Sequence, residues 1–378
     1  MVNQEWAASE SLPGMLQRGH GAGYRRALAT PGADALVLEC IAHDPRWDRQ
    51  VEERAGYYAR LVVELDIPVD AVPLDVDDPD ALLGLGLPVL IELSRSGSAE
   101  AFGILHGYLA RGAEPDWSAV DLLWREGGPT VREGLLPLVL DRLDDEGLAA
   151  AVTQDDDGPW RAWAHHPRVA AALAAAPRHQ PWPGHPDVGD RTTPELRALA
   201  DAPASPLRTA AFRELSRRGD LTLLDLAERH DLRNGVGTTS SLSGPVRDLG
   251  AAALPRARAW ADGDDAWLRA LGQHVIAAHG GHDDAPGVLG WFDEAVEDGE
   301  WCRSEDLADG LARLDHRPAV PSIASAWRAT PHSVARAHYL PALVRLGAPD
   351  LRSHLDDATH DCESEVRDLA RAHLAHPA

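Results

Sequence analysis

Lysine is absent from this 378-residue sequence, so all 36 basic residues are arginine. This absence excludes phosphate-binding loops that need a lysine, Schiff-base formation and any lysine general base. Phenylalanine (3 residues) and methionine (2 residues) are also scarce, and the apolar 44% of the chain is mainly Ala, Leu and Val. Such a composition favours closely packed helices.

Cysteine is rare, and Cys40, Cys302 and Cys362 lie far apart without any short paired spacing. This pattern excludes a disulfide framework and a zinc ribbon, and it is typical of a reducing cytoplasm. The first ten residues contain no apolar run, and the longest apolar stretch, 81–91, is too short to span a bilayer. We therefore expect a cytoplasmic protein without a membrane anchor.

Basic residues are few compared with acidic ones. The chain has 36 basic and 60 acidic residues, so its formal net charge is −24. The acidic residues are spread along the chain, and the arginines form no stripe that could displace counterions from DNA. Nucleic acid is therefore not expected as a partner. The charge favours a basic or neutral protein instead.

A pattern with one-face helical spacing recurs along the chain. It consists of an aliphatic residue followed by Arg, with small or aliphatic residues four and eight positions after the first, and it begins at Val131, Leu207, Val246 and Val366. These positions are 76, 39 and 120 residues apart, close to two, one and three multiples of one length. The pattern predicts a repeat of about 39 residues. A weaker copy begins at Val51.

This spacing, preceded by turns such as Ser205-Pro206, resembles the second helix of HEAT repeats. The resemblance implies an all-α fold, an α-solenoid of two-helix repeats, with repeats over 33–176 and 195–378. Residues 1–32 would then form an N-terminal segment or capping helix. The lack of lysine, together with very little asparagine, resembles the proteins of GC-rich actinobacteria.

Two stretches interrupt the pattern and are predicted to be long loops. Residues 177–194 are rich in Pro, Gly and His and would separate the two sets of repeats, and residues 234–245 are rich in Gly and Ser. The acidic run at 75–80 lacks the glycine and the distal Glu of an EF-hand loop. We interpret it as a solvated connector.

Two groups of aromatic and arginine side chains are candidates for a binding surface, because Trp and Arg are frequent interface anchors. They comprise Arg46, Trp47, Arg49, Tyr57 and Tyr58 in a charged segment, and Trp160 and Trp163 further on. Packing of the tryptophans between repeats is the alternative.

His274, His279, His282 and Asp283 are all competent metal ligands. On a helix His274 and His279 would point about 140° apart, and Gly280-Gly281 predicts a helix end, where His is common. We interpret the segment as a helix end and predict neither a metal nor another cofactor.

These features favour a non-catalytic scaffold or adaptor that binds a basic or neutral protein or peptide on a concave face formed by the second helix of each repeat. The alternative is an enzyme on a HEAT-like frame, either similar to DNA glycosylases or metal-dependent. No catalytic residue can be assigned, because the chain has neither a nucleophile elbow nor a cysteine with a partner identifiable from spacing. The sequence does not predict the oligomeric state.

Overall fold

The computed structural model describes residues 6–74, 84–111, 117–126, 129–154, 159–176, 186–229 and 238–376. Within these ranges the regular structure is helical throughout and contains no strand. The all-α class predicted from the sequence is thus confirmed. No helix in the described ranges combines the length and the apolar character that crossing a membrane would need. The acidic run at 75–80 lies outside the described residues.

The chain divides into two compact units. The first unit contains residues 1–180, 331–333 and 353–378, and the second contains 181–330 and 334–352. The C-terminal helix α22 (Ser364–Ala375) therefore belongs to the same unit as the N-terminal helices.

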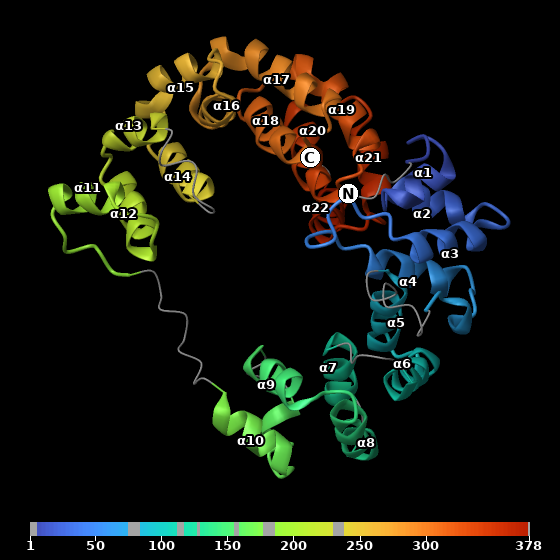
Figure 1. Ribbon diagram of the computed structural model, residues 1–378. Coiled ribbons are helices and arrows are strands. Elements are labelled where there is room, and N and C mark those ends of the chain that lie inside the picture. Colours follow the sequence, from blue (N-terminus) through green and yellow to red (C-terminus); the bar gives the residue numbers. More distant parts are fainter. Residues whose placement is uncertain are drawn as a thin grey trace. The chain divides into compact units, whose positions relative to one another are not determined.

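Helices of the first unit pack mainly against their neighbours in the sequence (Figure 1). They are α1 (Leu12–Gln17), α2 (Gly21–Leu28), α3 (Ala33–His43), α4 (Ala55–Glu64), α5 (Gly86–Arg95), α6 (Ala99–Arg111), α7 (Trp117–Glu126), α8 (Pro129–Leu140), α9 (Asp145–Gln154), α10 (Pro167–Ala175), most of α21 (Leu351–Ala358), and α22. Aliphatic side chains and buried tyrosine and tryptophan rings fill the core between them.

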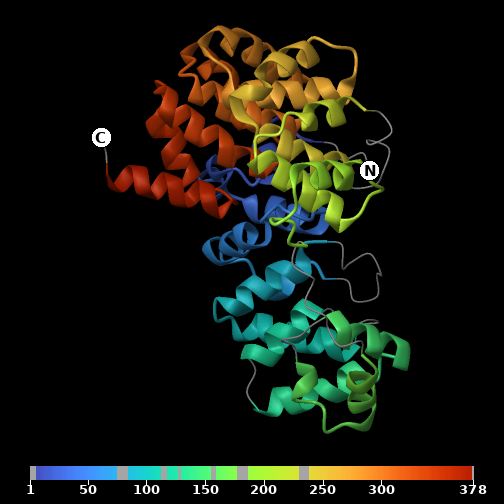
Figure 2. The same cartoon turned by 90° about the vertical axis from the view of Figure 1, so that its left-hand side faces the viewer.

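Helices of the second unit form two rows. The first row comprises α11 (Thr193–Asp201), α13 (Thr222–Glu228), α15 (Leu254–Ala261), α17 (Ala285–Glu297) and α19 (Val320–Ala329). The second row comprises α12 (Pro206–Arg217), α14 (Thr238–Arg247), α16 (Ala266–His279), α18 (Trp301–Arg313) and α20 (Arg336–Leu346). Each second-row helix packs against the next one in that row and against the first-row helix that precedes it in the sequence. Figure 2 shows the helices of the second unit in a view turned by 90°.

Local sequence accounts for where several of these helices begin. Ser205 caps α12 by accepting a hydrogen bond from the Arg208 amide at 3.2 Å, and Pro206 occupies the first turn, where a missing N–H costs nothing. Asp265 caps α16 in the same way through the amides of Trp267 and Leu268.

The observed spacing differs from the predicted period of about 39 residues. Second-row helices begin at residues 206, 238, 266, 301 and 336, which are 32, 28, 35 and 35 residues apart. Val131, Leu207 and Val366 lie in the first turns of α8, α12 and α22, whereas Val246 lies at the end of α14. The copy that begins at Val246 therefore occupies the opposite end of its helix from the other three.

The loop predicted over 234–245 is wrong from residue 238 onward, because α14 covers 238–247. Gly244 and Pro245 are poor helix formers, but Leu242 and Val246 are buried, and the Ser216 hydroxyl donates to the Pro245 carbonyl at 2.6 Å. Tertiary packing thus outweighs the local propensity. Of the other predicted loop, residues 177–185 lie outside the described residues, and α11 begins at Thr193.

Gly272 allows α15 and α16 to approach each other closely. A Cβ atom at this position would lie 2.4 Å from the Ala257 carbonyl oxygen of α15. Gly290 on α17 is the opposite case, since a Cβ atom there would meet no other atom within 4 Å.

We expect Gly272→Ala to lower the free energy of unfolding by about 1–3 kcal/mol, because the added methyl group would overpack the helix contact. Gly290→Ala should raise it by about 0.5–1 kcal/mol, since alanine has the higher helix propensity. Urea unfolding followed by circular dichroism measures both. Equal effects of the two substitutions would contradict the close approach of α15 and α16.

Leu207 and Val366 occupy the same place in the sequence pattern but differ in burial. The one-face spacing of the pattern predicts that both lie in a core; Val366 is 1% exposed as predicted, whereas Leu207 is 37% exposed, so the prediction is wrong for Leu207. The inward-facing residues of this turn of α12 are Arg208 and Ala211.

Val366→Asp should lower the free energy of unfolding by more than about 3 kcal/mol, because it places an unpaired carboxylate in the core. Leu207→Asp should change it by no more than about 1 kcal/mol, because the carboxylate stays hydrated. Thermal melts of both variants provide the comparison, and a larger loss for Leu207→Asp would show that the burial pattern is incorrect.

Candidate functional site

The segment between α3 and α4, residues 44–54, is a turn without helical structure. Asp44 is buried at its start and has a positive φ of 41°. Its carboxylate receives two hydrogen bonds from the Arg46 guanidinium, from Nε to Oδ1 and from Nη2 to Oδ2, both 2.8 Å long. Arg49 Nε lies 3.2 Å from the same carboxylate. These ion pairs hold the turn.

Glu52 is the second buried carboxylate of the turn. Oε2 accepts from the Trp47 amide at 3.1 Å and from Arg54 Nη2 at 3.2 Å, while Oε1 accepts from the Ser333 amide at 3.2 Å and lies 3.0 Å from His332 Nδ1. One side chain thus fixes both the backbone of the turn and the segment 331–333. All these residues belong to the first unit.

Arg54 is fully buried, and its guanidinium lies among groups from distant parts of the chain. It donates to Glu52, to the carbonyl oxygens of Arg18 and Pro331, and to Cys362 Sγ at 2.8 Å. Burial alone would lower the pKa of Arg54, but the surrounding acidic groups, Cys362 and Glu52 foremost, raise it above its ordinary value. Arg54 is therefore a buried permanent cation.

Glu363 extends this arrangement. It accepts from the Ser333 hydroxyl and, at 3.4 Å, from the Glu53 amide, while its own amide donates to Asp361 Oδ1 at 3.1 Å. We call the set of Glu52, Arg54, His332, Ser333, Cys362 and Glu363 the buried polar network.

Above this network the turn exposes Trp47, Arg49 and Val51, together with Gln50 and Glu53. Trp47 is 42% exposed and Val51 52% exposed, and the Arg49 side chain is about half exposed. The Trp47 ring rests against the His332 ring, with 4.5 Å between the ring centroids. The turn therefore presents an aromatic, an aliphatic and a cationic group among its exposed side chains.

A cleft of about 370 Å³ lies between α4, which follows the turn, and α5. It is lined by Gly56, Ala59, Arg60, Val63 and Glu64 from α4, and by Glu92 and Ser96 from the end of α5. The walls of the cleft therefore carry two carboxylates, one hydroxyl group and one arginine.

Tyr24 of α2 orients two of the charged groups in this cleft. Its hydroxyl donates to Glu64 Oε1 at 2.7 Å, and Arg60 lies over its ring, with 5.7 Å to the centroid. Burial, and then the hydrogen bond with Glu64, raise the pKa of Tyr24 well above its ordinary value, so the phenol remains a donor. Arg60 Nη2 also donates a hydrogen bond to the Asp361 carbonyl oxygen at 3.1 Å. Glu64 is thus fixed as an acceptor at the cleft wall.

Four of the aromatic residues predicted to bind a partner are core residues instead. Tyr57 and Tyr58 are buried, and their hydroxyls donate to the carbonyls of His20 and Leu16. Trp160 and Trp163 are also buried, and they pack against Trp117 and Trp124 with centroid distances of 5.4 and 5.5 Å. The chain contains little phenylalanine, and tyrosine and tryptophan rings fill its interior instead. Of the predicted binding residues, Arg46, Trp47 and Arg49 remain at the turn.

The structure does not gather the four metal-ligand candidates. His274 lies within α16 with Nδ1 3.0 Å from Asp306 Oδ2 of α18, and burial lowers the pKa of His274. His279 ends α16, as the glycines predicted, and lies 2.9 Å from the Arg247 carbonyl. His282 and Asp283 belong to the following 3-10 turn. None of the four belongs to a group of potential metal ligands within the described ranges.

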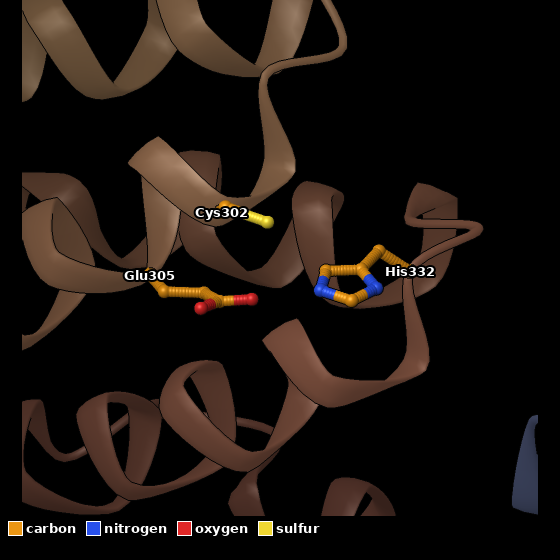
Figure 3. A group of neighbouring side chains, drawn as sticks. All are labelled: Cys302, Glu305 and His332. Carbon is orange, nitrogen blue, oxygen red and sulfur yellow. The ribbon is translucent and has the colours of Figure 1, made fainter. Parts of the chain in front are cut away.

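Two neighbouring residues at the start of α18 were not among the candidates from the sequence. Cys302 and Glu305 project from the same turn, with Sγ and a carboxylate oxygen within 4.8 Å of each other (Figure 3). Their spacing of three residues on a helix was the available signal. His332, also labelled in Figure 3, belongs to the first unit, where Glu52 holds its Nδ1.

We expect Glu52→Ala to lower the free energy of unfolding by about 3–5 kcal/mol, because it leaves the Arg54 cation buried without its carboxylate. Glu53→Ala, one residue away at an exposed position, should change it by less than about 0.5 kcal/mol. Urea unfolding of both variants gives the values. A loss below about 1 kcal/mol for Glu52→Ala would show that the pair does not support the turn.

Comparison of the chain with protein-family models, with curated proteins and with solved structures gives no match. The arrangement of the side chains is therefore the basis for assigning a function.

Proposed function

We propose that this chain is a non-catalytic binding protein that receives a basic or neutral segment of another protein at the 44–54 turn and the α4–α5 cleft. The observation that carries the proposal is the exposure of Trp47, Arg49 and Val51 on a turn that buried carboxylates hold in place. A preorganised turn loses little conformational entropy on binding, and Trp and Arg are frequent interface anchors.

The distribution of exposed apolar side chains supports this location. Among the described residues, seven large apolar side chains are exposed, and three of them, Trp47, Val51 and Val63, lie on the turn and on α4. Val63 lines the cleft, so the apolar groups extend from the turn to the cleft along the chain. Grouped exposed apolar residues are typical of interaction sites.

Charge supports the class of partner. The chain carries a formal charge of −24, and Glu64 and Glu92 stand on the cleft walls. Such a surface attracts cationic segments and repels acidic ones.

The proposal includes a HEAT-like scaffold of two-helix repeats. Its support is the packing of the second unit, where each pair of consecutive helices adds one helix to each row. Arrays of this kind build extended surfaces for protein partners. The unequal spacing of the helices makes the repeats degenerate rather than regular.

The enzymatic alternatives have less support. A glycosylase-like site would use Trp160 and Trp163 on an open face, but both rings are buried. A metal-dependent site would use His274 with His279, whereas His274 pairs with Asp306.

The test is selection of a display library of random peptides on the purified full-length chain. We expect enrichment of basic or neutral peptides and a loss of affinity of at least about tenfold, ~1.4 kcal/mol, for Trp47→Ala. Leu221→Ala, which removes another exposed apolar side chain (47% exposed) in the second unit, serves as the matched control.

Glu64→Gln and Glu92→Gln should reduce the preference for basic peptides in the same selection. Acidic consensus peptides, or equal affinities for the parent and the Trp47→Ala variant, would overturn the proposal.

A further inference from the structure

Two arginines from different helices of the first unit share one backbone carbonyl. Arg60 Nη2 of α4 and Arg367 Nη1 of α22 both donate to the Asp361 carbonyl oxygen, at 3.1 and 2.9 Å. Arg367 Nη1 also donates to the Cys362 carbonyl. Because two of these bonds end on the same oxygen atom, the two guanidinium groups are close enough to contact one small ligand together. We call Arg60 and Arg367 the arginine pair.

No acid neutralises the arginine pair directly. Within the described ranges neither guanidinium forms an ion pair with a carboxylate, and the carbonyl that they share carries no net charge. Burial, and then the positive charge of Arg60, lower the pKa of Arg367, while Cys362, Glu53 and Asp361 oppose this shift without reversing it. Two like charges therefore lie side by side and repel each other.

Other arginines of this part of the first unit do have acidic partners. Arg25 pairs with Asp357, and Arg371 Nη1 lies 3.5 Å from Asp368 Oδ1. The chain has 60 acidic residues for its 36 arginines, so carboxylates are plentiful. The arginine pair departs from this pattern, which points to an anion from outside the chain as its partner.

His360 adds a neutral donor beside the arginine pair. Its ring stacks on the Tyr24 ring with 4.9 Å between the centroids, and the Arg60 guanidinium lies 5.7 Å from the centroid of the same Tyr24 ring. Burial, supported by the charges of nearby arginines and opposed by that of Glu64, lowers the pKa of His360. The imidazole is therefore uncharged at neutral pH and has one N–H to donate.

The arginine pair keeps most of its hydrogen-bonding capacity for a ligand. Each guanidinium has five N–H donors on three nitrogens. Among the described residues, only Nη2 of Arg60 and Nη1 of Arg367 have acceptors. Both side chains are partly exposed, so the remaining nitrogens are accessible from solvent. Glu64, on the same helix as Arg60, is engaged by the Tyr24 hydroxyl at 2.7 Å.

We propose that Arg60 and Arg367 bind a phosphate group, with His360 as an additional donor. Two guanidinium cations balance the charge of a phosphate dianion, and their planar N–H forks match its oxygen atoms. A carboxylate would balance only one of the two cations. Free phosphate and a phosphate monoester present the same chemistry to this site. The inference does not rest on the proposed peptide binding, although Arg60 also lines the α4–α5 cleft.

The experiment is isothermal titration of the full-length chain with inorganic phosphate, at about pH 8, where the dianion predominates, and at constant ionic strength set with chloride. We expect saturable binding of one equivalent and weaker binding of acetate. Arg60→Gln and Arg367→Gln should each lower the affinity for phosphate at least about tenfold. O-Phosphoserine is the second ligand: tighter binding than inorganic phosphate identifies a monoester as the natural ligand, and weaker binding identifies the free ion.

Arg132→Gln is the matched control. Arg132 is exposed, belongs to the first unit and donates to two backbone carbonyls, at 2.7 and 2.9 Å, so its loss makes the same change in charge. This variant should bind phosphate like the parent. An equal loss of affinity in Arg132→Gln and Arg60→Gln would overturn the proposal.

The parent titration decides the question even if Arg367→Gln fails to fold, which a circular-dichroism melt would reveal. Absence of saturable phosphate binding by the parent would overturn the proposal without any variant. Acetate binding as tight as phosphate binding would overturn it as well.

Discussion

The contact between Glu52 and Arg54 is the interaction on which the functional part of the first unit depends. Both side chains are removed from water, which costs several kcal/mol for each charge unless further hydrogen bonds compensate. Here the compensation comes from the Trp47 and Ser333 amides on one side and from the carbonyls of Arg18 and Pro331 on the other. Residues far apart in the chain are thereby fixed to one buried ion pair, and the exposed turn acquires a defined backbone.

The second unit relies on a different constraint, the close approach of helices. Gly272 lets α16 lie directly against the Ala257 backbone of α15, and a Cβ atom at Gly310 would lie 2.7 Å from the Ala277 Cβ of α16. Helices packed so closely have little freedom to slide. Helix α18 in turn packs against α20, where the Ser304 and Tyr339 hydroxyls are hydrogen-bonded.

At the turn, buried polar contacts orient exposed groups. Glu52 accepts a hydrogen bond from the Trp47 amide and so fixes the backbone of the turn that exposes the Trp47 ring. The group offered to a ligand is thus held by a carboxylate that does not itself need to touch the ligand. Such support makes a site selective, because the free protein already has the geometry of the bound one.

The sequence by itself determined the helical class, the absence of lysine chemistry, the negative charge and several helix boundaries, such as the start of α12 at Pro206 and the end of α16 at His279. These follow from composition and from interactions within one or two turns. Tertiary structure alone decided that Val366 is buried and Leu207 is not, that Trp160 and Trp163 are core residues, and that residues 238–247 are helical. Tertiary structure also placed Asp306 beside His274. It placed Cys362 beside Arg54, although these two residues are 308 positions apart in the sequence. A helical period states which residues share a face, but only packing between distant segments decides what that face meets.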